Sequence, residues 1–263
     1  MQANTNYNGI KPGFQYVSRE EISLPGVRRI TLAGDPGCTG FRDESRFILA
    51  HILRQKCDAI FMLGDLACTG AEEEFRDVID FCNCRVQVPI FALCGNHDRP
   101  QYKSFLGLSS YTVVADNFVI IFLDNSSGYC TDQEIGFLRK ALERHRASNI
   151  ILAMHVPPPT EIERSHLMNL DWQKIKAVLD PHRRNIRQIF SAHIHGFHQY
   201  EIDGYPVTIT GGGGGAMIHD LKLPAQKIHH SISLDLHEDS RISSEVIKIS
   251  GLTSPYTAYK HFE

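Results

Sequence analysis

The stretch GNHDR, at positions 95–99, decides the fold, because it directly follows the apolar run PIFALC at positions 89–94. A short apolar run bounded by turn residues predicts a buried strand. That strand ends in an amide oxygen (Asn96), an imidazole (His97) and a carboxylate (Asp98), which are groups that bind metal ions or transfer protons. Glycine, asparagine and aspartate also favour ordinary turns, so this stretch alone leaves both interpretations open.

Four other apolar runs each predict a strand, and polar side chains follow every one of them. The runs occupy positions 30–33, 59–63, 150–153 and 189–190, and the residues that follow them are Asp35, Asp65, His155, and the pair His193 and His195. In open α/β sheets, functional sites collect beyond the carboxyl ends of strands. Any one of these side chains alone could belong to a turn or to the core, but their joint occurrence at five strand ends favours a single site.

The donor atoms at these strand ends match one another chemically. Together with Asn96 and His97 they comprise two carboxylates, one amide and three or four imidazoles that could ligate. Oxygen and nitrogen ligands of this kind suit Mn, Fe, Zn or Co. The number of ligands exceeds the need of one ion, so we expect a pair of ions, which a carboxylate can bridge in phosphoryl transfer.

Helices are predicted between the strands, and hairpins later in the chain. Apolar residues at helical spacing indicate a helix over positions 43–56. Two residue pairs have the spacing of a capping box and predict helix starts: Thr69 with Glu72, and Thr131 with Glu134. Turns at 116–117 and 203–204 predict two β-hairpins. Strands that alternate with helices and then give way to hairpins predict an α/β fold.

Length and charge limit the class of protein. The chain has 263 residues, of which 42% are hydrophobic, and this is enough for one large core. We therefore expect a polar lead-in over residues 1–28, without an assigned function, and one domain over residues 29–263. The net charge of −3, without a long basic run, argues against nucleic acid as an obligate partner. No apolar run reaches about 18 residues, so we expect no membrane partner.

The cysteines predict a reducing compartment. There are seven, without regular spacing, and no export signal precedes them, so we expect free thiols and a cytoplasmic location. Six of them are predicted to be small buried hydrophobic residues: Cys38, Cys57, Cys82, Cys84, Cys94 and Cys130. The sequence predicts no oligomeric state.

The order of the motifs resembles that of the calcineurin-like metallophosphoesterase family. The pattern of that family is Asp-x-His, then Gly-Asp, Gly-Asn-His-Asp/Glu, a histidine, and Gly-His-x-His, and the match here extends from Asp35 to His195. The resemblance implies a four-layer α/β/β/α sandwich of two mixed sheets flanked by helices. It also implies two divalent or mixed-valence metal ions (Mn, Fe or Zn) and a small phosphorylated substrate.

The resemblance assigns a role to each matching residue. The ligands of the first ion would be Asp35, Asp65 and His195, and those of the second would be Asn96, His155 and His193, with Asp65 as the bridge. His97 would donate a proton or stabilise charge at the phosphoryl group, and Asp98 would orient it. Arg99 could contact a phosphate or a surface carboxylate. The implied reaction is hydrolysis of a phosphate mono- or diester by a metal-bound hydroxide, with His97 assisting the leaving group.

The chain departs from the family pattern at the first motif. Gly37 occupies the position of the motif histidine, so one ligand of the first ion is missing. Gly-Asp-Pro-Gly instead resembles the purple acid phosphatase branch, in which a tyrosine three residues after the bridging aspartate replaces that ligand. Here this position is Cys68, which could ligate as a thiolate; otherwise a water could replace the ligand, or the ion could bind weakly. A milder departure is Ala192, which stands where glycine precedes His-x-His.

Two alternatives stay open at this point. The five glycines at 211–215 lack the pattern of a nucleotide-binding loop, and they predict backbone room near the site or a substrate contact. The chain could also be a non-catalytic scaffold of the same fold that binds a protein partner. Gly37 favours this scaffold, whereas His97 argues against it because a scaffold has no chemical need for that side chain. The motifs do not separate monoester from diester substrates, cyclic nucleotides included.

Overall fold

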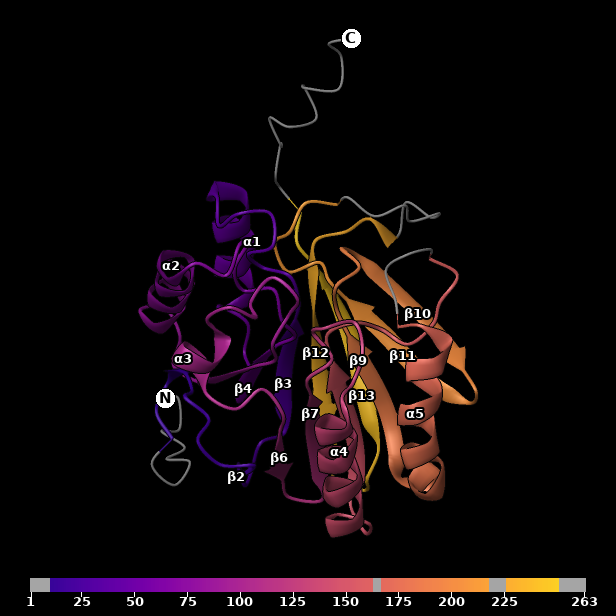
Figure 1. Ribbon diagram of the computed structural model, residues 1–263. Helices are drawn as coiled ribbons and strands as arrows, with labels where there is room; N and C mark the ends of the chain where they lie inside the picture. The colour runs from indigo at the N-terminus through magenta and orange to yellow at the C-terminus, as the bar shows by residue number, and fades with distance from the viewer. Residues whose placement is uncertain (1–9, 163–166, 218–225, 251–263) are drawn as a thin grey trace.

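Two mixed β-sheets lie face to face, and helices cover the outer face of each one (Figure 1). The computed structural model describes residues 10–162, 167–217 and 226–250. The predicted four-layer α/β/β/α sandwich is confirmed by this arrangement.

The first sheet has parallel strands at its centre and antiparallel strands at one edge. Its strand order is β1-β5-β4-β3-β12-β13. The bounds are β1 (Gly13–Phe14), β3 (Arg29–Ala33), β4 (Ala59–Met62), β5 (Pro89–Ala92), β12 (His230–Leu236) and β13 (Ile242–Lys248). Strands β1, β5, β4 and β3 run parallel, so the carboxyl ends of β3, β4 and β5 meet at one edge.

The second sheet also places parallel strand ends at one edge. Its order is β10-β11-β9-β8-β7-β6-β2. The bounds are β2 (Glu21–Ser23), β6 (Tyr111–Ala115), β7 (Phe118–Leu123), β8 (Asn149–Met154), β9 (Ile186–Ser191), β10 (Phe197–Ile202) and β11 (Tyr205–Thr210). Strands β7, β8, β9 and β11 are parallel. The predicted hairpins are confirmed as β6–β7 and β10–β11.

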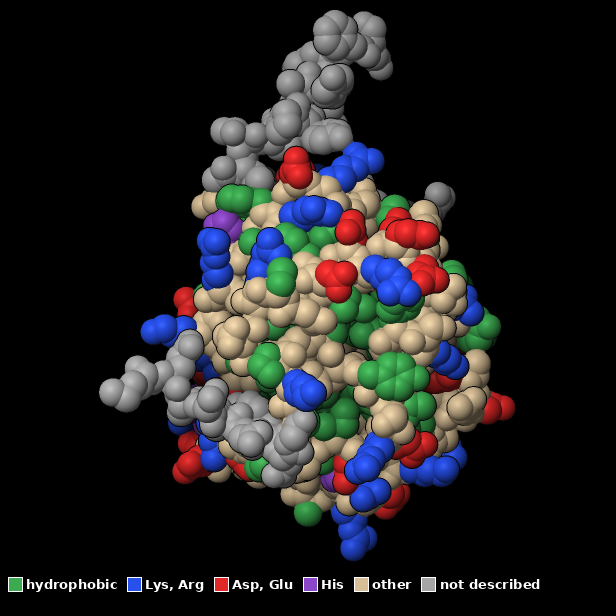
Figure 2. All heavy atoms as spheres, turned by 90° about the vertical axis from the view of Figure 1, so that its left-hand side faces the viewer, with side chains coloured by type: hydrophobic (Ala, Val, Ile, Leu, Met, Phe, Trp, Pro, Cys, Tyr) green, Lys and Arg blue, Asp and Glu red, His purple; other side chains and the backbone are tan. Residues whose placement is uncertain are grey.

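Helices α1, α2 and α3 cover the first sheet, and α4 and α5 cover the second (Figure 1). The bounds are α1 (Asp43–Ile52), α2 (Glu72–Asn83), α3 (Tyr102–Leu106), α4 (Asp132–Arg144) and α5 (Asn169–Leu179), with a 3₁₀ turn η1 (Asp180–Asn185) after α5. Helix α1 is shorter than the predicted 43–56. The face on the side of α1–α3 carries interspersed acidic and basic side chains (Figure 2).

One predicted helix start is confirmed and the other is wrong. The N–H of Thr131 donates to Glu134 Oε2 at 2.9 Å, as a capping box requires. Helix α2 begins at Glu72 itself, so Glu72 cannot close a box with Thr69. The carboxylate of Glu74 takes that role, because its Oε2 accepts the N–H groups of Thr69 at 2.8 Å and of Cys68 at 3.2 Å.

Aromatic side chains join the two sheets. The rings of Phe61 on β4 and Phe122 on β7 meet edge to face at 5.1 Å, and Tyr111 on β6 stacks on Phe122 at 4.6 Å. Burying such side chains contributes roughly 1.5–3 kcal/mol each. This packing holds the strand ends of one sheet against those of the other.

Part of the predicted lead-in takes part in both sheets. Strand β1 pairs with β5, and β2 pairs with β6. The first nine residues of the lead-in lie outside the described part, and the division into a lead-in and one domain stays a prediction. None of the helices in the described ranges is long and apolar enough to cross a membrane.

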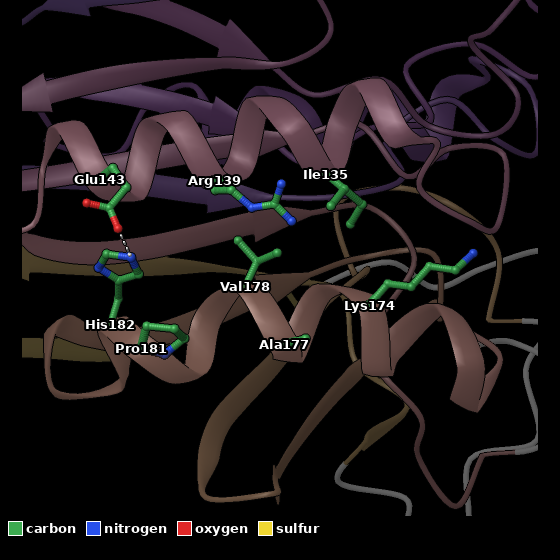
Figure 3. Close-up of a pocket in the computed structure, with 8 residues that line it drawn as sticks. All are labelled: Ile135, Arg139, Glu143, Lys174, Ala177, Val178, Pro181 and His182. Carbon is green, nitrogen blue, oxygen red and sulfur yellow. Dashed lines mark ion pairs between the residues drawn. The ribbon is translucent and has the colours of Figure 1, made fainter.

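A pocket lies between α4 and α5, on the outer side of the second sheet (Figure 3). Its lining includes Arg139, Glu143, Lys174 and His182, and His182 Nε2 lies 3.4 Å from a carboxylate oxygen of Glu143. The pocket includes none of the site residues predicted from the sequence. The candidate chemistry therefore lies elsewhere, at the strand ends.

Candidate metal centre

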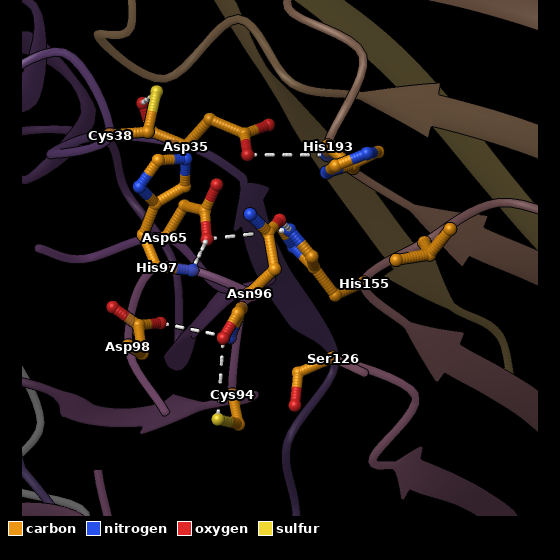
Figure 4. A network of polar contacts seen from close by, with 12 residues as sticks. Asp35, Cys38, Asp65, Cys94, Asn96, His97, Asp98, Ser126, His155 and His193 are labelled. Carbon is orange, nitrogen blue, oxygen red and sulfur yellow. Dashed lines mark hydrogen bonds and ion pairs between the residues drawn. The ribbon is translucent and has the colours of Figure 1, made fainter. Parts of the chain in front are cut away.

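Loops that follow five strands bring the predicted residues into one cluster (Figure 4). Asp35 follows β3, Asp65 follows β4, and Asn96 and His97 follow β5, all in the first sheet. From the second sheet, His155 follows β8, and His193 and His195 follow β9. Both sheets thus contribute to the site, as expected where carboxyl ends of parallel strands share an edge.

The first ligand group consists of Asp35, Cys38 and His195, all of them buried. One potential ligand atom of each lies within 4.8 Å of the others. Sγ of Cys38 is 2.9 Å from Nε2 of His195. Asp35 Oδ1 accepts the N–H of His193 at 3.2 Å, whereas Asp35 Oδ2 is buried without a hydrogen-bond partner. Such an oxygen is costly to bury unless a cation or a donor satisfies it.

The second ligand group consists of Asp65, His155 and His193, which meet the same 4.8 Å limit. Nε2 of His155 lies 3.0 Å from Asn96 Oδ1 and 3.4 Å from Asp65 Oδ1. The other ring nitrogen of His155, Nδ1, is 2.8 Å from the carbonyl oxygen of Leu63. A proton on Nδ1 that donates to this carbonyl leaves Nε2 as the ligating nitrogen.

Asp65 connects the two ligand groups. Its Oδ1 accepts the N–H of His97 at 3.0 Å, and its carbonyl oxygen accepts the N–H of Gly37 at 2.9 Å. The loop that carries Asp35 and Cys38 is therefore tied to the residue that heads the second group. Asp35 and Asp65 both have left-handed φ angles, of 60° and 55°, so the backbone is turned sharply at both strand ends.

The predicted orientation of His97 by Asp98 is wrong in its contacts. Both carboxylate oxygens of Asp98 accept backbone N–H groups, from Ala67 at 3.0 Å and from Gly95 at 2.9 Å. The ring of His97 instead directs Nδ1 at the carbonyl oxygen of Cys68, 2.5 Å away. Asp98 thus fixes the backbone of the loop, and the Cys68 carbonyl orients the imidazole.

Two other candidates lie apart from the ligand groups. The side chain of Cys68 is half-buried and belongs to neither group. Arg99 is exposed and forms no ion pair within the described ranges. Gly37 cannot be replaced by a histidine on this backbone, because a Cβ there would lie 1.8 Å from the carbonyl oxygen of Leu66.

Burial and nearby charges shift the pKa values of the ionisable groups in the cluster. Burial opposes the charged forms of Asp65 and His155, but each stabilises the other, so the pKa of Asp65 falls to about 2 and that of His155 rises to about 10. Burial raises the pKa of Asp98 to about 7 and raises that of Asp35 well above its usual value. Burial also raises the pKa of the Cys38 thiol.

The residues fit a pair of cations. Buried carboxylates and neutral imidazole nitrogens converge, and the orphaned Oδ2 of Asp35 lacks only a positive partner. Asp35, Cys38 and His195 could hold one ion, and Asp65, His155 and His193, with Asn96 beside them, could hold the other. A ligating imidazole must be neutral, so an ion would displace the second proton of His155.

Sequence reasoning missed two residues of this cluster. Cys38 was expected to be a small buried hydrophobic residue, although its position three residues after Asp35 was a usable signal. Asn125 belongs to no motif: its Oδ1 accepts the N–H groups of His155 and Val156 at 2.9 and 3.0 Å, and its amide donates to the carbonyl of Val156 at 2.6 Å. Such a contact between the end of β7 and the end of β8 has no sequence signature.

The fold and this cluster together define a phosphoesterase-like metal centre. A family model described as calcineurin-like phosphoesterase matches residues 28–197, and the chain belongs to that family. It is 27% identical over 168 residues to a protein of Colwellia psychrerythraea named "Probable cyclic nucleotide phosphodiesterase". That match covers 56% of this chain and 61% of the relative, so the chain spans less than two thirds of the relative's length.

Solved structures share the fold at low sequence identity. A purple acid phosphatase from yellow lupin (Lupinus luteus) superposes with a TM-score of 0.68 and 14% identity, covering 85% of this chain and 52% of that one. A dimetal phosphatase from Danio rerio gives a TM-score of 0.62 and 14% identity, covering 85% of this chain and 99% of that one. These similarities establish the fold, and the family model establishes membership of the calcineurin-like phosphoesterase family.

Proposed function

We propose that this chain hydrolyses a phosphate ester with two metal ions held at the strand ends. The observation that carries the proposal is that two groups of candidate ligand atoms form at the strand ends, and that the carbonyl oxygen of Asp65 in the second group accepts the N–H of Gly37 in the loop of the first. In the proposed centre, Asp65 would supply a ligand to both ions. The other proposed ligands are Asp35 and His195 for one ion, and Asn96, His155 and His193 for the other.

The ions would supply a water of lowered pKa as nucleophile and would neutralise phosphoryl oxygens. The chain itself supplies the geometry of proton transfer. Nδ1 of His97 faces the Cys68 carbonyl at 2.5 Å, so Nδ1 keeps its proton and Nε2 is the nitrogen that exchanges one. A His97 ring protonated at both nitrogens can thus give the Nε2 proton to the leaving oxygen.

The loop around His97 holds the ring in place. The carboxylate of Glu74 accepts the N–H groups of Cys68 and Thr69, which fixes the peptide whose carbonyl faces the ring. Asp98 anchors the other side of the motif through Gly95 and Ala67. Arg99, exposed at the end of the motif, would contact a phosphate of the substrate.

We propose a phosphodiester as the substrate class, with cyclic nucleotides as the first compounds to test. The support is the name of the Colwellia psychrerythraea relative, together with the small net negative charge of this chain, which disfavours a polyanionic partner. Manganese, iron and zinc all suit the oxygen and nitrogen ligands. Cytoplasmic location and the absence of a nucleic-acid partner stay predictions.

The test combines metal content with turnover. Protein purified without chelator should contain two ions per chain by elemental analysis. It should hydrolyse an aryl phosphate diester and a 3′,5′-cyclic nucleotide faster than an aryl monoester, with Mn, Fe or Zn supplied in turn. Two ions without turnover on any ester would favour the scaffold instead. Turnover that survives complete removal of metal would contradict the proposal.

A further inference from the structure

We infer that Cys38 binds the first metal ion as a thiolate, together with Asp35 and His195. This inference rests on the metal centre proposed above. Sγ of Cys38 lies 2.9 Å from Nε2 of His195, and one oxygen of Asp35 completes a group in which all three ligand atoms lie within 4.8 Å of one another. With bonds of about 2.3 Å to sulfur and about 2.0 Å to nitrogen, a tetrahedral ion holds these two atoms about 3.5 Å apart, so binding would move Sγ and Nε2 apart by about 0.6 Å.

The loop geometry excludes a side chain at position 37 and directs position 38 inward. A Cβ at Gly37 would lie 1.8 Å from the carbonyl oxygen of Leu66, which is backbone and cannot move aside. The next residue in the loop after β3, Cys38, brings its Sγ close to Asp35. Its side chain is only 5% exposed. The ligand missing at Gly37 is thus supplied one residue later, by sulfur in place of nitrogen.

The glycine run at 211–215 lies against the first ligand group and leaves room for its atoms. A Cβ at Gly215 would lie 2.6 Å from Cys38 Sγ, and one at Gly211 would lie 2.5 Å from Asp35 Oδ2. Any residue larger than glycine would therefore press on the two proposed ligand atoms. The chain keeps backbone alone against this pair, and the N–H of Gly215 donates to the carbonyl oxygen of Asp35 at 2.7 Å.

A hydrogen bond between Cys38 and His195 is the simpler interpretation of their contact. It would satisfy His195 but leave Asp35 Oδ2, fully buried and without a hydrogen-bond partner, uncompensated. A cation among the three side chains satisfies that oxygen as well. Cys68, the cysteine that the sequence favoured, lies outside the group and contributes its carbonyl oxygen to His97.

A thiolate changes which metal the first site prefers. Soft sulfur ligands select zinc or iron, whereas carboxylate and water ligands suit manganese and magnesium. The second ligand group contains only oxygen and nitrogen atoms. We therefore expect a mixed centre, in which zinc or iron binds at Cys38 and manganese is accepted at the second group. Binding releases the thiol proton to the solvent.

Cobalt substitution tests the inference without using activity. The wild-type protein loaded with Co²⁺ should show the near-ultraviolet charge-transfer absorption of a cobalt–thiolate bond. Cys38→Ser should lose this absorption and weaken one of two binding events in a calorimetric Co²⁺ titration at least 10-fold, because one ligand is lost. Cys84→Ser, which replaces an exposed cysteine, is the matched control and should keep both signals. Absorption that persists in Cys38→Ser, or that disappears only in Cys68→Ser, would overturn the inference.

A measurement on the wild-type chain covers the case in which Cys38→Ser does not fold. X-ray absorption of the zinc-loaded protein should show a sulfur scatterer at about 2.3 Å, and oxygen and nitrogen scatterers alone would overturn the inference. The outcome is independent of the proposed reaction. A sulfur-bound ion without ester turnover would contradict the proposed phosphoesterase activity but support Cys38 as a ligand. An active two-metal protein without metal–sulfur bonds would support the proposed activity but contradict Cys38 as a ligand.

Discussion

The two ligand groups differ in how far the chain itself satisfies them. In the second group, His155 Nε2 already lies 3.0 Å from Asn96 Oδ1 and 3.4 Å from Asp65 Oδ1. In the first group, one oxygen of Asp35 is buried without a hydrogen-bond partner, and Cys38 brings sulfur in place of nitrogen. One group is thus satisfied by its own polar contacts, whereas the other leaves a buried carboxylate oxygen uncompensated.

The largest effect should come from changing Asp65, the proposed bridge between the two ions. Asp65→Asn keeps the shape of the side chain but removes its charge, so both ions should be lost. Turnover should fall by more than the about 10²- to 10⁴-fold effect of losing a general acid. Metal analysis and ester hydrolysis measure both quantities. Asp77→Asn, on the exposed face of α2, is the control and should change neither. Retention of two ions in Asp65→Asn would show that the groups are independent.

His97→Asn should separate chemistry from metal binding. We expect turnover to fall about 10²- to 10⁴-fold while both ions stay bound, because the imidazole donates a proton and belongs to neither ligand group. Steady-state kinetics with matched metal analysis checks this. His182→Asn, in the pocket between α4 and α5, serves as the control. Full turnover would contradict the role of His97, and loss of an ion would make it a ligand.

Acid should weaken the support of the first group. Burial lowers the pKa of His230 to about 4, and the backbone N–H of the same residue donates to the carbonyl oxygen of Gly212 behind the first group. The unfolded chain takes up this proton near pH 6.5, whereas the folded chain resists it until about pH 4. The contribution of His230 to the free energy of unfolding is therefore fully present above pH 6.5. The free energy of unfolding falls by up to about 3 kcal/mol on acidification to about pH 4.

Urea unfolding of wild type and His230→Asn between pH 4 and pH 7.5 measures this contribution. For each protein, the slope of the free energy of unfolding against pH is determined. The difference between the slopes of wild type and His230→Asn isolates the contribution of His230 from that of the other titrating groups. His237→Asn, in the turn after β12, is the control and should keep the wild-type slope. Equal slopes for wild type and His230→Asn would refute the assignment.

The smallest effect should distinguish the groups most selectively. Asn125→Ala removes the amide that holds the backbone of His155, so affinity at the second group should fall about 10- to 100-fold, while the first group is unchanged. Calorimetric titration with zinc resolves the two binding events. Asn185→Ala is the control, because that side chain also bonds only to backbone, donating to the carbonyls of Arg146 and Ser148, but lies on η1. Equal weakening of both events would mean that Asn125 acts on the whole fold.

The sequence predicted the fold and most of the cluster because both depend on local signals. The apolar runs before Asp35, Asp65 and His155 are each short. Each run predicts both a buried strand and the residue at which that strand ends. The α/β/β/α layers followed from the family resemblance and are confirmed. Strands β1 and β2 were not predicted, because strands of two or three residues exist only through their long-range partners.

The spacing of Cys38 from Asp35 was only a weak signal in favour of Cys38 over Cys68, for a similar reason. Which cysteine turns inward depends on the contact of Gly37 with Leu66, and this contact joins two loops. The capping partner Glu74 lay two residues beyond the predicted Glu72, since the helix starts later than the spacing of Thr69 indicated. Features determined within one short segment were predictable from the sequence. Features that depend on a contact between two distant segments were not.

The left-handed backbone at three residues of the cluster lowers the stability of the fold at the positions where the proposed activity needs a side chain. Asp35, Asp65 and His193 have φ angles between 55° and 65°, a conformation that costs roughly 1 kcal/mol or more for a residue with a side chain. Glycine at any of these positions would relax the backbone but would also remove a polar side chain of the cluster. Such a substitution is therefore expected to raise thermal stability while it weakens metal binding, the usual trade-off between stability and function.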